Sequence, residues 1–397
     1  MFRNRKIVFV AGARTPVGKY SGSLAAVPNH VAGAHALMAA ANRAGIGVDE
    51  IEELVVGCVG QVGGDAFLAR RIALEAGMPT TSTAMTVNRL CGSGLQAIYD
   101  AALELEMGES KIVAAGGSEN MSGQPFLDYQ ARNGWRLGDH TLVDGTLSLV
   151  TDPFAGAPMG VSAENVARRY HVSRTEQDEF AAESQKRAAE AQDAGYLQPE
   201  IAPITIKERK TVREFAADEH IRSNTTVESL GKLRTAFATD DEATVTAGNS
   251  SGINDGAAFL IMTTEEEALE RGLPILGELV DFQKVGIEPE IMGYAPKLAI
   301  EKILSRNDLE VSDLDWVELN EAFASQAVAV IRDAGLDPAK TNPLGGAIAL
   351  GHPVGATGAI LTLRTLLQLK RTGGETGLVS MCIGGGQGVA AIVRVMK

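Results

Sequence analysis

Basic charge is scarce in this 397-residue chain. It carries 36 Lys and Arg residues against 50 Asp and Glu residues, which gives a net charge of −14. Nucleic-acid binding requires a basic surface, because the phosphate backbone has to be neutralised. The composition therefore excludes nucleic acid as a partner.

Long apolar runs and paired cysteines are also missing. The first apolar run, 7–10, is followed by Ala-Gly-Ala-Arg-Thr-Pro, so it is too short for a signal-peptide core or a membrane span. The three cysteines, Cys58, Cys91 and Cys382, form no CxxC pair, and the six histidines show no zinc-ligand spacing. An odd number of cysteines without an export signal is typical of a reducing compartment. We expect a cytoplasmic protein with no membrane partner and no metal.

Glycine and small apolar residues are abundant. The chain is 45% hydrophobic and 22% charged, which is typical of a globular protein, and its length suits two or three domains. Many of the 44 glycines stand in short clusters beside small residues. Such clusters indicate tight turns and close backbone approach.

The two ends of the chain have the same layout. Residues 48–57 match 311–320 in their apolar pattern, and Cys91-Gly92-Ser93-Gly94 corresponds to His352-Pro353-Val354-Gly355 at nearly the same offset. A strand that ends in glycines follows each turn. We interpret this as two copies of one α/β unit with parallel sheets flanked by helices; chance similarity between two βαβ stretches is the alternative.

A segment of about 120–246 fits neither copy. Ser173 and Glu176 form a capping-box signature, which predicts a helix from there to about residue 194, ending at Gly195. Within 201–236, seven Lys and Arg residues face five Asp and Glu residues, so this part is the least acidic. It is a candidate place for an anionic ligand, although a merely solvated face explains the charge equally well.

Cys91 follows a β-branched stretch and precedes a helical pattern. That places its sulfur at a strand-to-helix turn, beside unpaired backbone N–H groups. The helix dipole is expected to lower the thiol pKa there, and the thiolate is the nucleophile. A buried structural cysteine is the alternative.

Three further residues are candidates for the chemistry. His352 holds in the second copy the place of Cys91 in the first, so it is a candidate base for the thiol. Cys382 precedes three glycines whose N–H groups suit an oxyanion hole, with a disulfide to Cys91 as the alternative. Asn320 follows the strand 317–319 and is a candidate for holding a water.

Five segments in this order and spacing resemble the motifs of the thiolase family over nearly the whole chain: NRLCGSGLQA, AGNSSGINDGAA, NEAFA, GHPVGATGA and CIGGGQG. The resemblance implies an α/β fold of two βαβαβαββ halves in a layered arrangement, with an inserted loop domain. It divides the chain into an N-terminal half (1–119 and 247–272), a loop domain for CoA binding and oligomerisation (120–246) and a C-terminal half (273–397).

The resemblance also implies an activity. It is the reversible Claisen condensation and thiolysis of 3-oxoacyl-CoA, as in acetyl-CoA acetyltransferases and 3-ketoacyl-CoA thiolases of fatty acid metabolism. Coenzyme A is then a substrate or product, and no cofactor is needed. The implied residues are Cys91 as the acylated nucleophile, His352 as its activator, Cys382 as the acid/base on the α-carbon, Asn320 with a water and His352 as one oxyanion hole, the Cys91 and Gly384 amides as the other, Arg222, Ala247 and Ser251 along the CoA, and Met159 and Phe323 in the acyl pocket.

The chain departs from the short-chain biosynthetic members of that family. Pro158 stands where His is common, and Tyr294-Ala295-Pro296 stands where a Gly-Pro pair is usual; the proline resembles members that accept longer chains. The segment 120–153 resembles the loop that builds tetramers, so we expect a homo-oligomer, with a tetramer preferred to a dimer. Two alternatives remain at this point: a carrier-protein-dependent condensing enzyme, and a catalytically idle acyl-CoA or lipid-binding relative.

Overall fold

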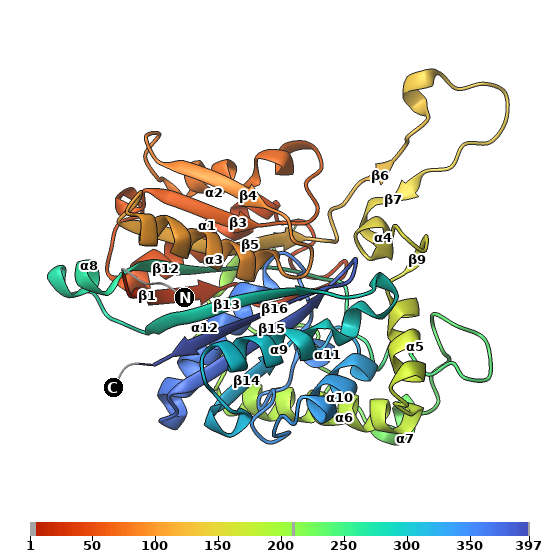
Figure 1. The fold of residues 1–397 in the computed structure, drawn as a ribbon. Coiled ribbons are helices and arrows are strands. Elements are labelled where there is room, and N and C mark those ends of the chain that lie inside the picture. Colours follow the sequence, from red (N-terminus) through yellow and green to blue (C-terminus); the bar gives the residue numbers. More distant parts are fainter. Residues whose placement is uncertain (1–4, 209–210, 396–397) are drawn as a thin grey trace.

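One mixed sheet runs through the molecule (Figure 1). The computed structural model describes residues 5–208 and 211–395. Along the sheet the strand order is β4-β3-β5-β12-β1-β13-β16-β15-β14, and the short β2 pairs with β12. The strands are β1 (Ile7–Arg14), β2 (Gly18–Lys19), β3 (Glu53–Gly57), β4 (Thr83–Val87), β5 (Ile112–Asn120), β12 (Asn254–Thr264), β13 (Gly277–Gly286), β14 (Trp316–Leu319), β15 (Thr376–Ile383) and β16 (Gln387–Arg394).

The order is the same on both sides of the sheet centre, where β1 pairs with β13. β3, β5, β12 and β1 correspond to β14, β15, β16 and β13, and the isolated parallel bridge from Val317 to Thr341 stands where β4 lies in the first half. The predicted duplication is therefore visible in the topology. The predicted parallel sheets are wrong for the centre, because only β4-β3-β5 and β14-β15 are parallel. β16 returns from β15 through a tight glycine turn and so pairs with it antiparallel.

Helices form three layers around the two halves of the sheet. Alternate residues of β5 face two of these layers. Val113 and Ala115 join the core around α3 and α12, whereas Ile112 and Ala114 join the core around α1 and α2. A third core, around α9 and α10, covers the opposite face of the second half. The α-helices are α1 (Asn29–Ala44), α2 (Leu68–Ala76), α3 (Ser93–Met107), α4 (Gly145–Leu149), α5 (Gly160–Arg169), α6 (Arg174–Asp193), α7 (Val227–Leu230), α8 (Glu265–Glu270), α9 (Ala295–Arg306), α10 (Ala324–Asp333), α11 (Ala347–Leu350) and α12 (Thr357–Thr372), and the 3₁₀ turns are Val48–Glu50, Gly63–Phe67, Ala131–Asn133, Pro289–Tyr294 and Val311–Asp313.

Between β5 and β12 the chain leaves the sheet. It forms three hairpins: β6 (Phe126–Leu127) with β7 (Val143–Asp144), β8 (Thr151–Asp152) with β9 (Ala157–Pro158), and β10 (Ile204–Glu208) with β11 (Thr211–Phe215). The first of them carries an arm that stands away from the body in Figure 1.

The helix predicted in this segment is confirmed. Ser173 Oγ accepts from the Glu176 amide, and the Glu176 carboxylate accepts from the Ser173 amide at 2.7 Å. α6 ends at Asp193, two residues before Gly195, whose φ is 75°. Among the residues that the structure describes, no helix is long and apolar enough to cross a membrane.

Candidate active site

Cys91 lies on a strained turn between β4 and α3. Leu90, just before it, has a φ of 46°, which is unfavourable for a side chain with a Cβ. Ser93 Oγ holds the turn, since it accepts from the Arg89 amide at 2.8 Å and donates to the Leu90 carbonyl at 2.6 Å. The turn is therefore stabilised by its own hydrogen bonds and presents Cys91 ahead of the first helical residue.

The Cys91 thiol is enclosed although the residue is only half-buried. Burial raises the pKa of the thiol to about 11, while hydrogen bonds from the Gly384 and Cys91 amides act in the opposite direction. The predicted lowering of this pKa by the start of the helix is thus wrong for the free protein, because the loss of water outweighs the N–H groups. Both amides thus act on the thiol, and their role as an oxyanion hole stays a prediction.

His352 is buried at the start of the turn that leads into α12. Its amide donates to Asn254 Oδ1 at 2.9 Å, and its Nδ1 lies 2.7 Å from Thr357 Oγ1. The Thr357 hydroxyl donates to the Pro353 carbonyl at 2.9 Å, so we infer that Nδ1 carries the ring hydrogen and that Nε2 is an acceptor. Burial lowers the pKa of His352 to about 4, which keeps the ring neutral at neutral pH.

Asn320 follows β14 and faces His352. Its Nδ2 lies 3.4 Å from His352 Nε2, and its amide donates to the Ser380 carbonyl of β15 at 2.9 Å. Its Oδ1 is buried and has no protein partner. A buried oxygen of this kind fits a site that holds a water.

Cys382 and Gly384 lie at the end of β15 and in the turn after it. All three cysteines are free, so the alternative of a disulfide between Cys91 and Cys382 is contradicted. Burial, followed by the interaction with Cys91, raises the pKa of Cys382 well above its usual range. At Gly384 an added Cβ would lie 2.7 Å from Met159 Cε and 3.1 Å from Leu90 Cδ1, so this turn packs closely against Met159 and against the residue before Cys91.

An apolar cluster surrounds Cys382. It contains both predicted acyl-pocket residues, Met159 and Phe323, and it also contains Phe237 from the loop segment. Phe237 and Phe323 meet edge to face with their ring centroids 6.0 Å apart. The other members of the cluster are Ala163, Val245, Met292 and Ala322.

The residues predicted to lie along an anionic ligand are near the surface. Arg222 lines a cavity of about 410 Å³ together with Lys19 and His220. Burial, followed by the charges of Arg222 and Lys19, lowers the pKa of His220 to about 4. Ala247 is exposed, and the half-buried Ser251 donates its amide to the Ala322 carbonyl at 3.0 Å.

Family models agree with this arrangement. The model "Thiolase, N-terminal domain" matches residues 7–266, and "Thiolase, C-terminal domain" matches residues 273–395. The chain belongs to the thiolase family. The predicted family, fold and acyltransferase class are therefore confirmed, and they replace the two alternatives of a carrier-protein-dependent condensing enzyme and an idle relative.

Individual thiolases match over their full lengths. The chain is 47% identical to the Beta-ketothiolase BktB of Cupriavidus necator and 44% identical to an acetyl-CoA acetyltransferase of Shinella zoogloeoides, each over 98% of both chains. A crystal structure of the Bacillus anthracis acetyl-CoA acetyltransferase superposes with a TM-score of 0.97 at 40% identity and covers 100% of both chains. Human mitochondrial 3-ketoacyl-CoA thiolase in complex with CoA superposes with a TM-score of 0.94 at 40% identity, covering 99% of this chain and 98% of the other.

Four residues of this thiolase site were not predicted from the sequence. Asn254 and Thr357 hold His352, Glu119 contacts the turn after it, and Phe237 joins the apolar cluster. Asn254 and Thr357 lie within the family-like motifs, which could have drawn attention to them. Phe237 has no comparable signal in the sequence.

The two departures from the short-chain pattern lie in different surroundings. Pro158 is exposed in β9, next to Met159 of the apolar cluster. Tyr294 belongs to the separate core around α9, where it stacks on Tyr170 and donates to Asp333 at 2.9 Å. Only the first departure therefore borders the predicted acyl pocket.

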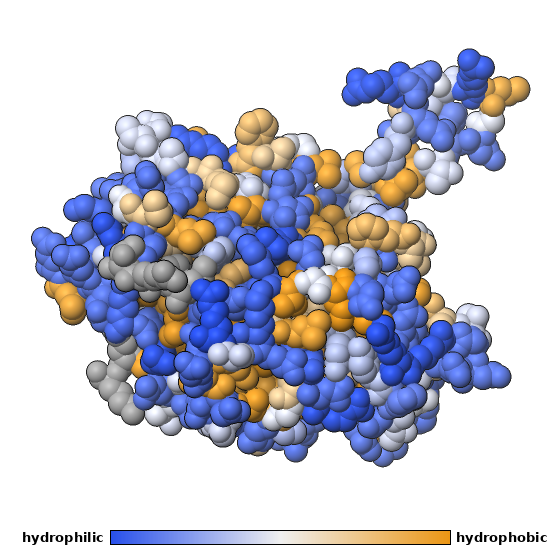
Figure 2. Space-filling model, viewed as in Figure 1, coloured by the Kyte–Doolittle hydropathy of each residue, from blue (hydrophilic) through white to orange (hydrophobic). Residues whose placement is uncertain are grey.

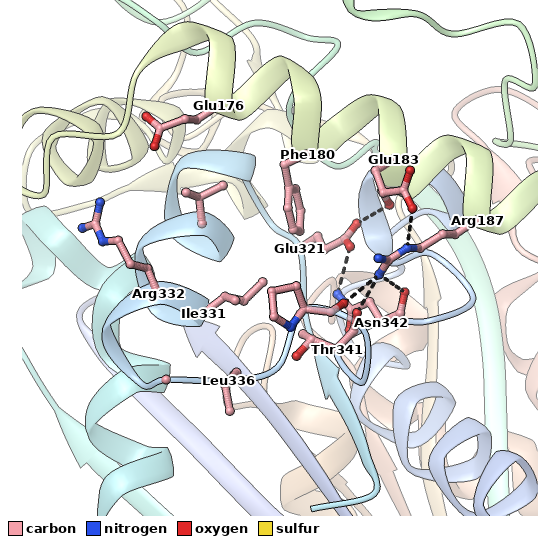
Figure 3. A pocket seen from close by; sticks show the side chains of 14 residues that line it. Glu176, Phe180, Glu183, Arg187, Glu321, Ile331, Arg332, Leu336, Thr341 and Asn342 are labelled. Carbon is pink, nitrogen blue, oxygen red and sulfur yellow. Dashed lines mark hydrogen bonds and ion pairs between the residues drawn. The ribbon is translucent and has the colours of Figure 1, made fainter. Parts of the chain in front are cut away.

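A second cavity, of about 540 Å³, lies behind the reactive loops, between α6, α10 and the residues 335–342 (Figure 3). Glu321 is at its inner wall and accepts hydrogen bonds from Ser184 at 2.6 Å, Asn342 at 2.9 Å and the Ile348 amide at 3.2 Å. None of the predicted site residues lines this cavity. The hydrogen bonds of Glu321 fix the loop that carries the neighbouring Asn320 to α6 and to the chain at Asn342 and Ile348.

Proposed function

We propose that this thiolase is an acetyl-CoA C-acyltransferase that makes and cleaves 3-oxoacyl-CoA through an acyl thioester on Cys91. The observation that supports this best is the meeting of loops from both halves. An added Cβ at Gly92, beside Cys91, would lie 2.6 Å from Ile383 Cδ1, beside Cys382, and one at Gly384 would lie 3.1 Å from Leu90 Cδ1. A nucleophile, an amide pair and a second ionisable thiol thus occupy one enclosed place.

Acyl transfer to Cys91 is the first half-reaction. His352 Nε2 accepts the thiol proton, the sulfur attacks the thioester carbonyl, and the Cys91 and Gly384 amides donate to the oxygen that becomes negative. The carbonyl re-forms as the C–S bond to coenzyme A breaks, and the coenzyme A sulfur takes the proton from His352. Since the resting ring is neutral and Nε2 is an acceptor, His352 is ready for this step.

Carbon–carbon bond formation is the second half-reaction. The Cys382 thiolate takes a proton from the α-carbon of acetyl-CoA, and Asn320 with a water faces the enolate oxygen together with His352. The enolate carbon attacks the acyl group on Cys91, the C–S bond to Cys91 breaks, and the released Cys91 thiolate takes up the proton from Cys382. In thiolysis the Cys382 thiol returns the proton to carbon.

We propose that coenzyme A enters along Arg222, Ala247 and Ser251. The cavity holds the cations Lys19 and Arg222 beside a neutral His220, and the Glu219 carboxylate also lines it. The two cations suit the phosphates of this ligand. Human mitochondrial 3-ketoacyl-CoA thiolase, which shares the fold, has been crystallised with CoA.

The acyl pocket is proposed to accept more than four carbons. Phe323, Met159 and Phe237 offer an apolar lining beside Cys382, and the neighbouring Pro158 brings neither a polar side chain nor an amide donor. The test is to measure thiolysis rates for 3-oxoacyl-CoAs of increasing length, with detection of acylated Cys91 by mass spectrometry. Activity confined to acetoacetyl-CoA would contradict the proposed chain length, and turnover without acyl-Cys91 would contradict the mechanism.

A homo-oligomer, with a tetramer preferred, is part of the same proposal. The arm exposes Tyr129, Trp135 and Leu137 by 73%, 64% and 108%. Figure 2 shows the arm as mostly hydrophilic, with a small hydrophobic group at its outer end. β4 is an edge strand with Met85 exposed, which is typical of strands that pair with a second chain. We further propose the division into 1–119 with 247–272, 120–246 and 273–397, and a cytoplasmic location.

A further inference from the structure

The turn after His352 lies in a socket lined by glycines of the first half. An added Cβ would lie 2.6 Å from the Gly355 carbonyl oxygen at Gly57, 2.9 Å at Gly94 and 2.0 Å at Gly117. Each distance is too short for a real side chain, so this turn touches the backbone of β3, α3 and β5 directly. Gly94 is three residues after Cys91, and Gly355 is three residues after His352, so the socket sets the spacing of the two reactive loops.

Glu119, near the end of β5, forms the floor of this socket. Its Oε2 accepts from the Gly355 amide at 3.0 Å and from the Val59 amide at 2.9 Å, and its Oε1 accepts from the Gly60 amide at 3.0 Å. Cys58 Sγ donates to Oε1 at 3.6 Å. One carboxylate therefore ties the turn of the second half to the loop after β3 of the first half.

The chemistry of these contacts favours a tether. Glu119 is 1% exposed, and its recorded partners are neutral, so its bonds to N–H groups replace the water that it lost. Burial raises the pKa of Glu119 to about 7, and the amides of Val59, Gly60 and Gly355 act against this. A leucine or alanine here would leave those amides buried without a partner.

We propose that Glu119 is a positioning residue that holds the His352 turn at the correct distance from Cys91 by binding the Gly355 amide. This inference rests on the proposed roles of Cys91 and His352. The reach of the carboxylate is then the important property, because a reacting group displaced by ~1 Å costs roughly a hundredfold in rate. The negative charge of Glu119 is not needed for the tether.

Two substitutions separate reach from charge. Glu119→Gln keeps the length of the side chain, and its amide oxygen can accept from Gly355 and Val59, so the tether is kept. Its NH₂ group replaces Oε1 beside Cys58 and the Gly60 amide, and that amide loses its acceptor. Glu119→Asp keeps the charge but is one methylene shorter, so it no longer spans both loops. We expect Glu119→Asp to lower kcat roughly a hundredfold with little change in KM for acetyl-CoA, and Glu119→Gln to keep kcat within about fivefold of the wild type.

Cys58→Ala is the matched control, because it removes a donor to the same carboxylate without touching the Gly355 tether. It should keep the wild-type kcat. Thermal unfolding of each full-length variant checks that it is folded, and mass spectrometry of wild-type acetyl-Cys91 tests the proposed function separately. Wild-type enzyme without acetyl-Cys91 would reject the function.

The tether is rejected by either of two results in an enzyme that does acylate Cys91. One is wild-type kcat in Glu119→Asp, and the other is a Glu119→Gln variant that loses as much kcat as Glu119→Asp. If Glu119→Asp does not fold, Glu119→Gln decides alone: kcat within about fivefold supports the tether, and a larger loss with unchanged KM rejects it.

Discussion

The turns before α3 and α12 are built alike but hold different chemistry. Each has a residue with positive φ just before the reactive position: Leu90 with 46° before Cys91, and Gly351 with 98° before His352. The first half places a half-buried thiol there, whereas the second half places a buried imidazole. The duplicated unit thus repeats the scaffold and not the reactive group.

The two turns also differ in the side chains around them and in the pKa of their reactive residues. The second half also carries Asn320 and Cys382 at the ends of β14 and β15, and both are buried. Burial shifts the pKa of His352 to about 4 and that of Cys91 to about 11, so both groups are neutral at neutral pH. Two copies of one fold can therefore divide the work, with the nucleophile on one copy and the proton-transfer groups on the other.

The largest loss of activity is expected from a substitution in the first half, at Cys91. Cys91→Ala should lower thiolysis at least about 10⁴-fold and abolish the acyl-enzyme, because the nucleophile is removed. Iodoacetamide should label Cys91 before the buried Cys58 and Cys382, and acetyl-CoA should protect it. Peptide mapping checks the site, and inactivation that follows Cys58 instead would refute the assignment.

A smaller and different effect is expected from Cys382. Cys382→Ser should lower condensation and solvent-deuterium exchange into the acetyl methyl group roughly a hundredfold, because a hydroxyl is a much poorer base than a thiolate. Acetylation of Cys91 should persist, since it requires only Cys91 and His352. Mass spectrometry of the label and of acetyl-Cys91 measures both steps. If this variant loses acylation as completely as Cys91→Ala, the two cysteines do not divide the work.

The buried imidazole leads to a third prediction. Thr357→Val removes the acceptor of His352 Nδ1–H and should slow Cys91 acylation about tenfold, the value of one buried hydrogen bond. A pKa lowered to about 4 means that the wild-type ring stays neutral until the pH falls to that value. The single-turnover rate of Cys91 acylation should therefore fall only as the pH approaches 4, where His352 becomes protonated. A fall in this rate near pH 6.5 would show that burial does not control the pKa of His352.

The smallest effect on catalysis is expected from substitutions at the two sheet edges and in the arm. The edge at β14 is covered by the chain around Thr341, while β4 is open, so the first half is proposed to be the side that associates. Leu137→Asp in the arm should convert tetramers to dimers with little change in kcat, because the arm stands away from the body of the molecule in Figure 1. Light scattering measures this, and a wild-type monomer of about 42 kDa would contradict the assembly.

Local patterns allowed much of the fold to be predicted. The capping box of Ser173 and Glu176 indicated the helix to within one or two residues, because these hydrogen bonds are local. The repeated pattern of apolar positions indicated the duplication, because each copy of the pattern lies within a short stretch of chain. The sheet centre was predicted wrongly, since pairing between β1, β12, β13 and β16 depends on how distant segments meet.

The sequence by itself determined the family motifs and the two-copy layout, and it predicted the reactive residues, because each is written in short stretches of chain. Only the tertiary structure decided how they act. The pKa of Cys91 is raised by enclosure from both halves, against the expected effect of its own helix. The contact of Glu119 with Gly355 joins residues 236 positions apart. Desolvation and long-range packing depend on the whole fold, and no local pattern contains them.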